Sequence, residues 1–259
     1  MSGTYKATGI NLKTMPLGEA DRLLTVLTKE HGLIKLVAPG ARKQKNSLSP
    51  RSGLFIVNDL LIVSGRSLDK MIQAETQQVY PGLSKDLGKL TACQYLAEIV
   101  IAYALSDQPQ EQLFAIFTEH LRRIEALPPR ATTPLLAHLA QAVFHILVLV
   151  GLSPQVQTCC LTQTTLTPNF AQTDWLVGFN PQLGGALSLE PLELEQPLPA
   201  ITLTALELSL LQQLAQPLLP QLFPEAPWRK IERILRDYTQ YQLGRSLQSA
   251  SFVDTLITG

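Results

Sequence analysis

The chain has 259 residues, of which 46% are hydrophobic and 16% charged, and its formal net charge is zero. This hydrophobic content excludes an intrinsically disordered chain, and the length allows one large domain or two smaller ones. The three cysteines, two of them adjacent at Cys159 and Cys160, are too few for a disulfide framework, and the N-terminal residues lack the apolar core of a signal peptide. We therefore expect a cytoplasmic protein.

The first 80 residues are predicted to form short β-strands, at residues 5–12, 23–28, 33–39, 54–63 and 71–76. The second and third strands form a hairpin across residues 29–32, where Gly32 can adopt the positive φ that such a turn requires. Alternation along the third strand then places Lys35 on the face opposite Ile34 and Leu36. Five short strands fit a barrel of the OB type, which commonly binds single-stranded nucleic acid, although other small barrels remain possible.

Charge is distributed unevenly along the chain. Residues 1–80 contain eleven Lys and Arg against six Asp and Glu, a net charge of +5, so the remainder carries −5. Between Glu30 and Asp59 there is no carboxylate but there are five cations, Lys35, Arg42, Lys43, Lys45 and Arg51. These cations either solvate a loop or contact phosphates, and we predict the second, a DNA-binding site. Aromatic residues are scarce in this segment, which favours binding to phosphates over stacking on bases.

After Gly82 the hydrophobic periodicity becomes helical. Helices are predicted through residues 90–104 and from Pro109 to Ile124, with a third that follows Thr132 and is closed by Gly151. Residues 152–200 form an irregular insert, after which Thr204 begins a capping box and residues 228–243 and 252–257 form further helices. The apolar run at 135–152 is interrupted by polar residues and is predicted to be a buried helix and not a membrane span. We expect an α+β protein with an OB domain at 1–80 and a helical domain at 81–259.

A second basic feature lies in the last long helix. Arg229, Arg233 and Arg236 are spaced at i, i+4 and i+7, which predicts a basic stripe next to Lys230. The stripe is either a solvated surface, a second DNA contact, or a dock for an acidic peptide. Three other arginines compete for the same role, namely Arg122, Arg123 and Arg130. The sequence does not select among these readings.

Two segments resemble a known family. The run PLGEADRLLTVLTKEHG at residues 16–32, followed by VAPGARK at 37–43, is similar to the N-terminal signature of the RecO family, and residues 232–238 and 243–247 resemble its closing helices. The resemblance implies a recombination mediator that binds single- and double-stranded DNA, anneals complementary strands and, with RecR, helps load RecA onto DNA coated by SSB. It also implies a contact with the SSB C-terminal tail, association with the nucleoid, and no chemical reaction or cofactor.

The family often carries a zinc site built from two CxxC pairs, and this sequence departs from that pattern. Only Cys159 and Cys160 remain, and Gly184-Gly185 lies where the second pair is expected. Zinc prefers four Cys or His ligands, so we expect a degenerate, metal-free insert.

Two other functions remain open as alternatives. The first is an adaptor that links RecR and SSB without binding DNA, which a DNA-binding assay distinguishes from the mediator. The second is a DNA-processing enzyme. The sequence contains no nucleophile elbow, no HExxH and no carboxylate cluster, so a non-enzymatic protein is expected.

Overall fold

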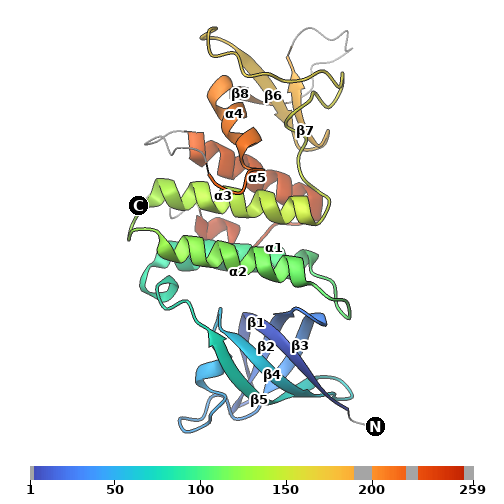
Figure 1. The fold of residues 1–259 in the computed structure, drawn as a ribbon, viewed down its shortest axis with the longest axis vertical. Helices are drawn as coiled ribbons and strands as arrows, with labels where there is room; N and C mark the ends of the chain where they lie inside the picture. The colour runs from blue at the N-terminus through green and yellow to red at the C-terminus, as the bar shows by residue number, and fades with distance from the viewer. Residues whose placement is uncertain (1–2, 190–199, 220–226, 254–259) are drawn as a thin grey trace. The chain divides into compact units, whose positions relative to one another are not determined.

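The computed structural model describes residues 3–189, 200–219 and 227–253. The chain divides into two compact units, Met1–Pro129 and Arg130–Gly259, and each unit is described by itself. Within the described residues, the first unit contains a β-barrel and a pair of helices, and the second contains helices and a small sheet (Figure 1).

The barrel consists of five strands, drawn in blue to cyan in Figure 1. They are β1 (Thr4–Leu17), β2 (Asp21–Thr28), β3 (Gly32–Ala38), β4 (Val57–Val63) and β5 (Asp69–Gln78). The barrel closes in the order β1-β2-β3-β5-β4, with every pair antiparallel except β3 and β5. Alternate side chains fill its interior, among them Leu24, Val26, Leu36 and Ile62. The prediction of a five-stranded OB-type barrel is confirmed.

Two strands differ from their predicted bounds. β1 continues to Leu17 instead of ending at Leu12, because a bulge between Asn11 and Lys13 lets the strand go on pairing with β2. β4 begins at Val57 and not at Leu54, since a short 3-10 turn at Pro50–Ser52 and a positive φ of 57° at Phe55 come first. The positive φ of 65° expected at Gly32 is confirmed.

A helical hairpin completes the first unit. It is formed by α1 (Leu87–Tyr103) and α2 (Glu111–Ala126). Asp86 caps α1 by accepting a hydrogen bond from the Lys89 amide at 3.1 Å. The buried Lys89 ammonium donates to the carbonyl oxygens of Glu125 and Leu127, which lie at the C-terminal end of α2. One lysine thereby satisfies carbonyl groups that the helix itself leaves unbonded.

The barrel and the hairpin belong to one compact unit. The loop between α1 and α2 pairs with the β2–β3 turn through a bridge between Gly32 and Ser106, and the Leu33 amide donates to the Leu105 carbonyl at 2.9 Å. The boundary predicted near residue 80 therefore separates strands from helices, whereas the compact unit continues to Pro129.

The second unit is built on α3 (Thr132–Leu149), which packs against α5 (Pro227–Leu243). Between them in sequence lie β6 (Leu176–Asn180), β7 (Gly185–Ser188), β8 (Ile201–Thr204) and α4 (Ala205–Gln213). The three strands form an antiparallel sheet in the order β7-β6-β8, so the insert is more regular than predicted. Its residues 190–199, and residues 254–257 of the predicted last helix, lie outside the described residues. The predicted capping box at Thr204 is present.

α3 is the one helix in the described ranges that is long and apolar enough to cross a membrane by length and composition, with a mean hydropathy of 1.5. However, 61% of it is buried inside the protein. Gln141 donates from Nε2 to the Gln216 carbonyl at 2.9 Å, and His145 Nε2 lies 2.8 Å from the Leu214 carbonyl oxygen. The polar residues that interrupt the apolar run thus bind the segment after α4, as in a core helix of the unit.

Candidate nucleic-acid interface

The segment from Pro39 to Gly53, here called the basic loop, is held firmly on the barrel. The Gly40 amide donates to Asp21 Oδ1 at 2.7 Å, and the Arg42 amide donates to the Ala20 carbonyl at 2.9 Å. At the other end of the loop, the buried Asn11 side chain donates to the carbonyl groups of Arg51 and Gly53 at 2.9 and 2.8 Å. The loop backbone is therefore fixed before any ligand arrives, which lowers the entropic cost of binding.

The structure places the five predicted DNA-binding residues in three settings. Arg42, Lys43 and Lys45 are exposed on the loop. Arg51 is half-buried and donates from Nη1 to the Ser47 carbonyl of its own loop. Lys35 lies outside the loop, on the outer face of β3, and is exposed as predicted.

None of these five cations forms an ion pair within 4.0 Å in the part of the chain that the structure describes. The one side-chain hydrogen bond that Arg42 makes there is from Nη1 to the Gly18 carbonyl, at 2.7 Å. This bond orients the guanidinium on the β1–β2 turn without neutralising its charge. The loop consequently presents positive charge to solvent from a fixed backbone.

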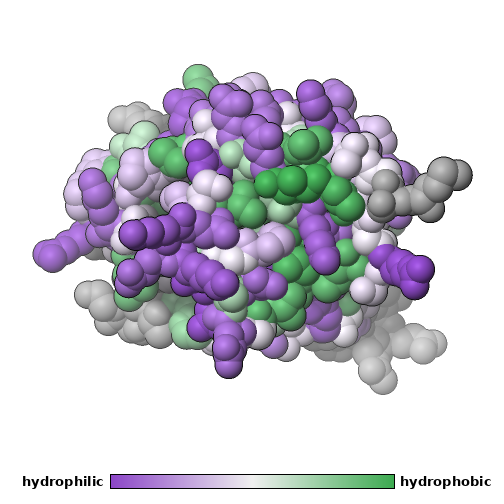
Figure 2. Space-filling model, turned by 90° about the horizontal axis from the view of Figure 1, so that it is seen from below, coloured by the Kyte–Doolittle hydropathy of each residue, from purple (hydrophilic) through white to green (hydrophobic). Residues whose placement is uncertain are grey.

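Three acidic side chains of the barrel lie away from the basic loop. Glu30, Asp59 and Glu75 line a hollow of about 420 Å³ together with Lys6 on β1. Asp59 accepts hydrogen bonds from Thr8 Oγ1 at 2.8 Å and from Gln77 Nε2 at 2.7 Å. Figure 2, which views the molecule from below, shows mainly hydrophilic side chains with a hydrophobic group near the middle. The three carboxylates make this hollow unfavourable for phosphates.

Comparison with known proteins assigns both parts of the chain. The model of the family described as "Recombination protein O N terminal" matches residues 1–80, and that described as "Recombination protein O C terminal" matches residues 84–251. The chain belongs to the RecO family. Relatives named DNA repair protein RecO are 55% identical in Gloeothece citriformis and 50% identical in a Nostoc species. Each comparison covers at least 98% of this chain and 97% of the relative.

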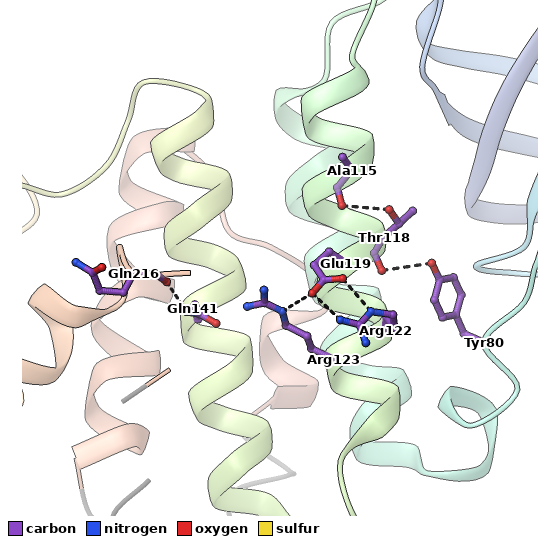
Figure 3. Close-up of polar contacts among 8 residues, drawn as sticks. All are labelled: Tyr80, Ala115, Thr118, Glu119, Arg122, Arg123, Gln141 and Gln216. Carbon is purple, nitrogen blue, oxygen red and sulfur yellow. Dashed lines mark hydrogen bonds and ion pairs between the residues drawn. The ribbon is translucent and has the colours of Figure 1, made fainter. Parts of the chain in front are cut away.

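Within this RecO-family chain, the predicted arginines of α2 are not free charges. Glu119 accepts from Arg122 at 2.8 Å and from Arg123 at 2.7 Å (Figure 3). The hydrogen bond from Arg122, followed by that from Arg123, lowers the pKa of Glu119 from 4.5 to about 2 against the opposing effect of burial. Arg130 is exposed with a φ of 58° just past the end of α2. The charges of Arg122 and Arg123 are therefore partly neutralised, unlike those of the basic loop.

The predicted stripe on α5 is wrong at Arg236. Arg229 and Arg233 are exposed, and Lys230 forms an ion pair with Glu207 at 2.7 Å. Arg236, in contrast, is 6% exposed, forms an ion pair with the buried Glu232 at 3.3 Å and donates to the Ala250 carbonyl at 2.8 Å. The segment after α5 folds back onto the helix and buries this position, which helical spacing alone cannot reveal.

The insert contains one buried thiol where the family often has zinc. Cys159 Sγ accepts hydrogen bonds from the amides of Ser188 at 3.3 Å and Thr162 at 3.5 Å. Burial raises the pKa of this thiol, but these bonds and the Thr162 hydroxyl outweigh it and hold the pKa below its ordinary value. Burial raises the pKa of the neighbouring Cys160.

The donors around Cys159 do not fit a structural zinc site. Thr162 stands where a CxxC pair would have its second cysteine, and hydroxyl groups are poor substitutes for thiolates. In the described ranges no three His, Cys, Asp or Glu side chains gather into a possible metal site. The insert instead uses the Cys159 sulfur as a hydrogen-bond acceptor.

Sequence reasoning missed Lys13, an exposed cation of the barrel surface. Lys13 was expected in a turn because the first strand was predicted to end at Leu12, whereas it lies in β1 and pairs with Thr25 of β2. The signal that could have revealed it is the continued match of residues 13–17 to strand residues beyond a single-residue irregularity.

Proposed function

We propose that this RecO-family protein is a recombination mediator that binds single- and double-stranded DNA through its basic loop. In this proposal it anneals complementary strands and, with RecR, helps load RecA onto single-stranded DNA coated by SSB. The observation that carries the proposal is the anchored loop on an OB-type barrel, whose cations form no ion pair within the described residues. Exchanging condensed counterions for these fixed cations favours binding.

The mode of binding follows from how the aromatic residues of the barrel segment are used. Tyr5 donates its hydroxyl to Asp69 at 2.5 Å and lies edge-on to His31 with ring centroids 4.8 Å apart. Phe55 and Tyr80 are 3% and 6% exposed. With these rings engaged in packing, few faces remain on which bases could stack. Binding is therefore dominated by phosphates and tolerant of base sequence, as strand annealing requires.

The helices supply the protein contacts in this proposal. The SSB C-terminal tail would dock at basic side chains of this region, among the candidates Arg122, Arg123, Arg130, Arg229, Lys230 and Arg233. Arg236 leaves that set because its guanidinium is buried against Glu232. The protein acts in the cytoplasm, associated with the nucleoid, and catalyses no covalent step.

The decisive experiment measures binding to a labelled single-stranded oligonucleotide by fluorescence anisotropy across a salt series. The double variant Arg42→Glu with Lys43→Glu is expected to bind at least tenfold more weakly than the unmodified protein. If all five predicted cations contact phosphates, the logarithm of the affinity falls by roughly 3 to 4 per decade of salt. Lys85→Glu, at an exposed lysine before α1, reverses one charge and is the control for the single variants Arg42→Glu and Lys43→Glu, and it should change the affinity much less than either.

The same experiment separates the mediator from the alternative function. No binding of the unmodified protein at low salt would overturn the proposal and leave an adaptor that links RecR and SSB. Strong preference for one base sequence would contradict binding through phosphates. If DNA is bound, annealing of two complementary labelled strands without any nucleotide cofactor tests the second step.

A further inference from the structure

The outer face of β1, β2 and β3 is divided into a covered end and an open end. Near the β2–β3 turn, Ile10 and Leu27 point outward but are fully buried, because α1 packs on β1 and α2 packs on β2. Toward the opposite end of the same strands, Lys13 and Lys35 are exposed. Only the open end, with Lys13 and Lys35, can receive a large ligand.

The strand register places the two lysines in one row. Lys13 pairs with Thr25, and Thr25 pairs with Lys35. Residues paired across a sheet share a face and neighbouring strands lie about 4.8 Å apart, so the two lysine backbones are roughly 10 Å from each other. Between them lies the short side chain of Thr25, which is only 7% exposed, so the two ammonium groups stand on either side of a buried residue.

A bulge is what gives Lys13 this position. Ala7 belongs to the barrel core, and strict alternation from it would also turn residue 13 inward. The irregularity between Asn11 and Lys13 inserts one residue and reverses the alternation, so that Lys13 lies opposite the outward-facing Thr25. The barrel thereby avoids burying an ammonium group.

The row continues toward the basic loop. One step along the strands, Met15 pairs with Leu23, Leu23 with Val37, and Val37 with Lys70 of β5, where Met15 and Lys70 are exposed. Past this second row come the ends of β1 and β3 and the β1–β2 turn, on which Arg42 is anchored. Lys13, Lys35 and Lys70 therefore lie on a surface continuous with the cations of the loop.

We propose that Lys13, Lys35 and Lys70 form a track on the outer face of the barrel that extends the DNA site from the basic loop across β1, β2, β3 and β5. The ligand is a single strand of DNA, held by its phosphates. Charge complementarity supports this ligand, because none of the three lysines forms an ion pair within 4.0 Å among the described residues, whereas the carboxylates of Glu30, Asp59 and Glu75 line a separate hollow. This inference rests on the DNA binding proposed above and assigns the path of the strand.

The test compares Lys13→Ala, Lys35→Ala and Lys70→Ala with Lys6→Ala as the matched control. Lys6 is an exposed lysine on the same strand as Lys13, but it borders the acidic hollow. Binding to a labelled oligothymidylate of about 16 nucleotides, the upper end of the range for one OB fold, is measured across a salt series. Each track variant is expected to bind several-fold more weakly and to reduce the salt slope by about 0.7, the value for one lost phosphate contact on a single strand. Lys6→Ala should leave both unchanged.

The outcomes distinguish this inference from the function on which it rests. If Lys13→Ala and Lys70→Ala behave like Lys6→Ala while the Arg42/Lys43 double variant loses binding, the track is overturned and the loop alone is the DNA site. If the unmodified protein binds no DNA, both are overturned. Thermal denaturation of each variant shows that the barrel is folded. Equal losses with duplex and single-stranded DNA would refute the assignment of a single strand to the track.

Discussion

A methyl group added to Gly32 would come within 2.0 Å of the carbonyl oxygen of Leu105. Gly32 closes the β2–β3 turn with a φ of 65°, and Leu105 lies in the loop between α1 and α2. The close approach permits the bridge between Gly32 and Ser106, through which the barrel and the helical hairpin share backbone hydrogen bonds.

We expect Gly32→Ala to destabilise the protein by about 2 to 4 kcal/mol, because it adds a clash with backbone to the cost of a left-handed conformation. Gly18→Ala is the control, since Gly18 has a φ of 58° and no atom near the added Cβ. It should cost only about 1 to 2 kcal/mol. Urea denaturation of both variants measures their free energies of unfolding. Equal losses of stability in Gly32→Ala and Gly18→Ala would contradict the role of the Leu105 contact.

The buried ion pair of α5 gives a second prediction. Arg236→Ala removes the positive charge paired with the buried Glu232 carboxylate and is expected to cost about 3 to 5 kcal/mol. Replacing both residues with apolar ones, Glu232→Leu with Arg236→Met, should restore much of that stability. Arg233→Ala, at an exposed position, should change stability by no more than about 0.5 kcal/mol. An equally small effect at Arg236 would show that this side chain is not buried in solution.

Glu119 provides a prediction on pH. Since its pKa in the folded protein is lowered to about 2 from 4.5, the ion pairs with Arg122 and Arg123 stabilise the protein above pH 4.5 and are lost as the pH falls toward 2. The contribution is small, because the Arg122 guanidinium and the Glu119 carboxylate are exposed to solvent. A titration of the carboxyl groups monitored by NMR should show a low titration midpoint for Glu119 in the unmodified protein. In Arg122→Ala with Arg123→Ala the midpoint should return toward the ordinary value, and an unchanged midpoint would contradict the assignment.

The insert is expected to be stable without metal. Metal analysis should find no stoichiometric zinc, and a strong chelator should leave the melting temperature unchanged. Cys159→Ala should destabilise the protein by about 1 to 3 kcal/mol, because it removes the buried sulfur that accepts hydrogen bonds from the Ser188 and Thr162 amides. Cys160→Ala, at a partly exposed thiol, serves as the control and should cost less. A chelator-induced fall in melting temperature would overturn this prediction.

Much of the barrel can be predicted from the sequence, because period-two alternation and the glycine of the β2–β3 turn are local signals. The second half of β1 cannot, since the bulge at Asn11 and Lys13 interrupts the period on which the prediction depends. The same interruption concealed Lys13 from the candidate site. In the insert, β6 and β7 are only five and four residues long and are joined through glycines, so their periodicity is too short to detect.

Charge patterns identified the basic loop but could not show which cations are neutralised. The basic loop contains no carboxylate, so its composition alone indicates that its cations have no acidic partner within the loop. For Arg236, burial depends on Ala250, fourteen residues away, and for Arg122 the charge is balanced by Glu119 on the preceding turn. The spacing of residues along a helix does not predict a tertiary contact such as that of Arg236 with Ala250. It does predict a pair at i, i+3 such as Glu119 with Arg122.

The barrel closes through only two residue pairs between β3 and β5, Leu36 with Asp69 and Val37 with Lys70. This is the shortest strand pairing in the barrel, and its parallel geometry is slightly weaker per residue than the antiparallel pairings around it. Local opening should therefore start here, with the amides of these residues exchanging hydrogen sooner than those of β1 and β2. A ligand that contacts both Lys35 and Lys70 would hold β3 and β5 together and slow hydrogen exchange of these amides.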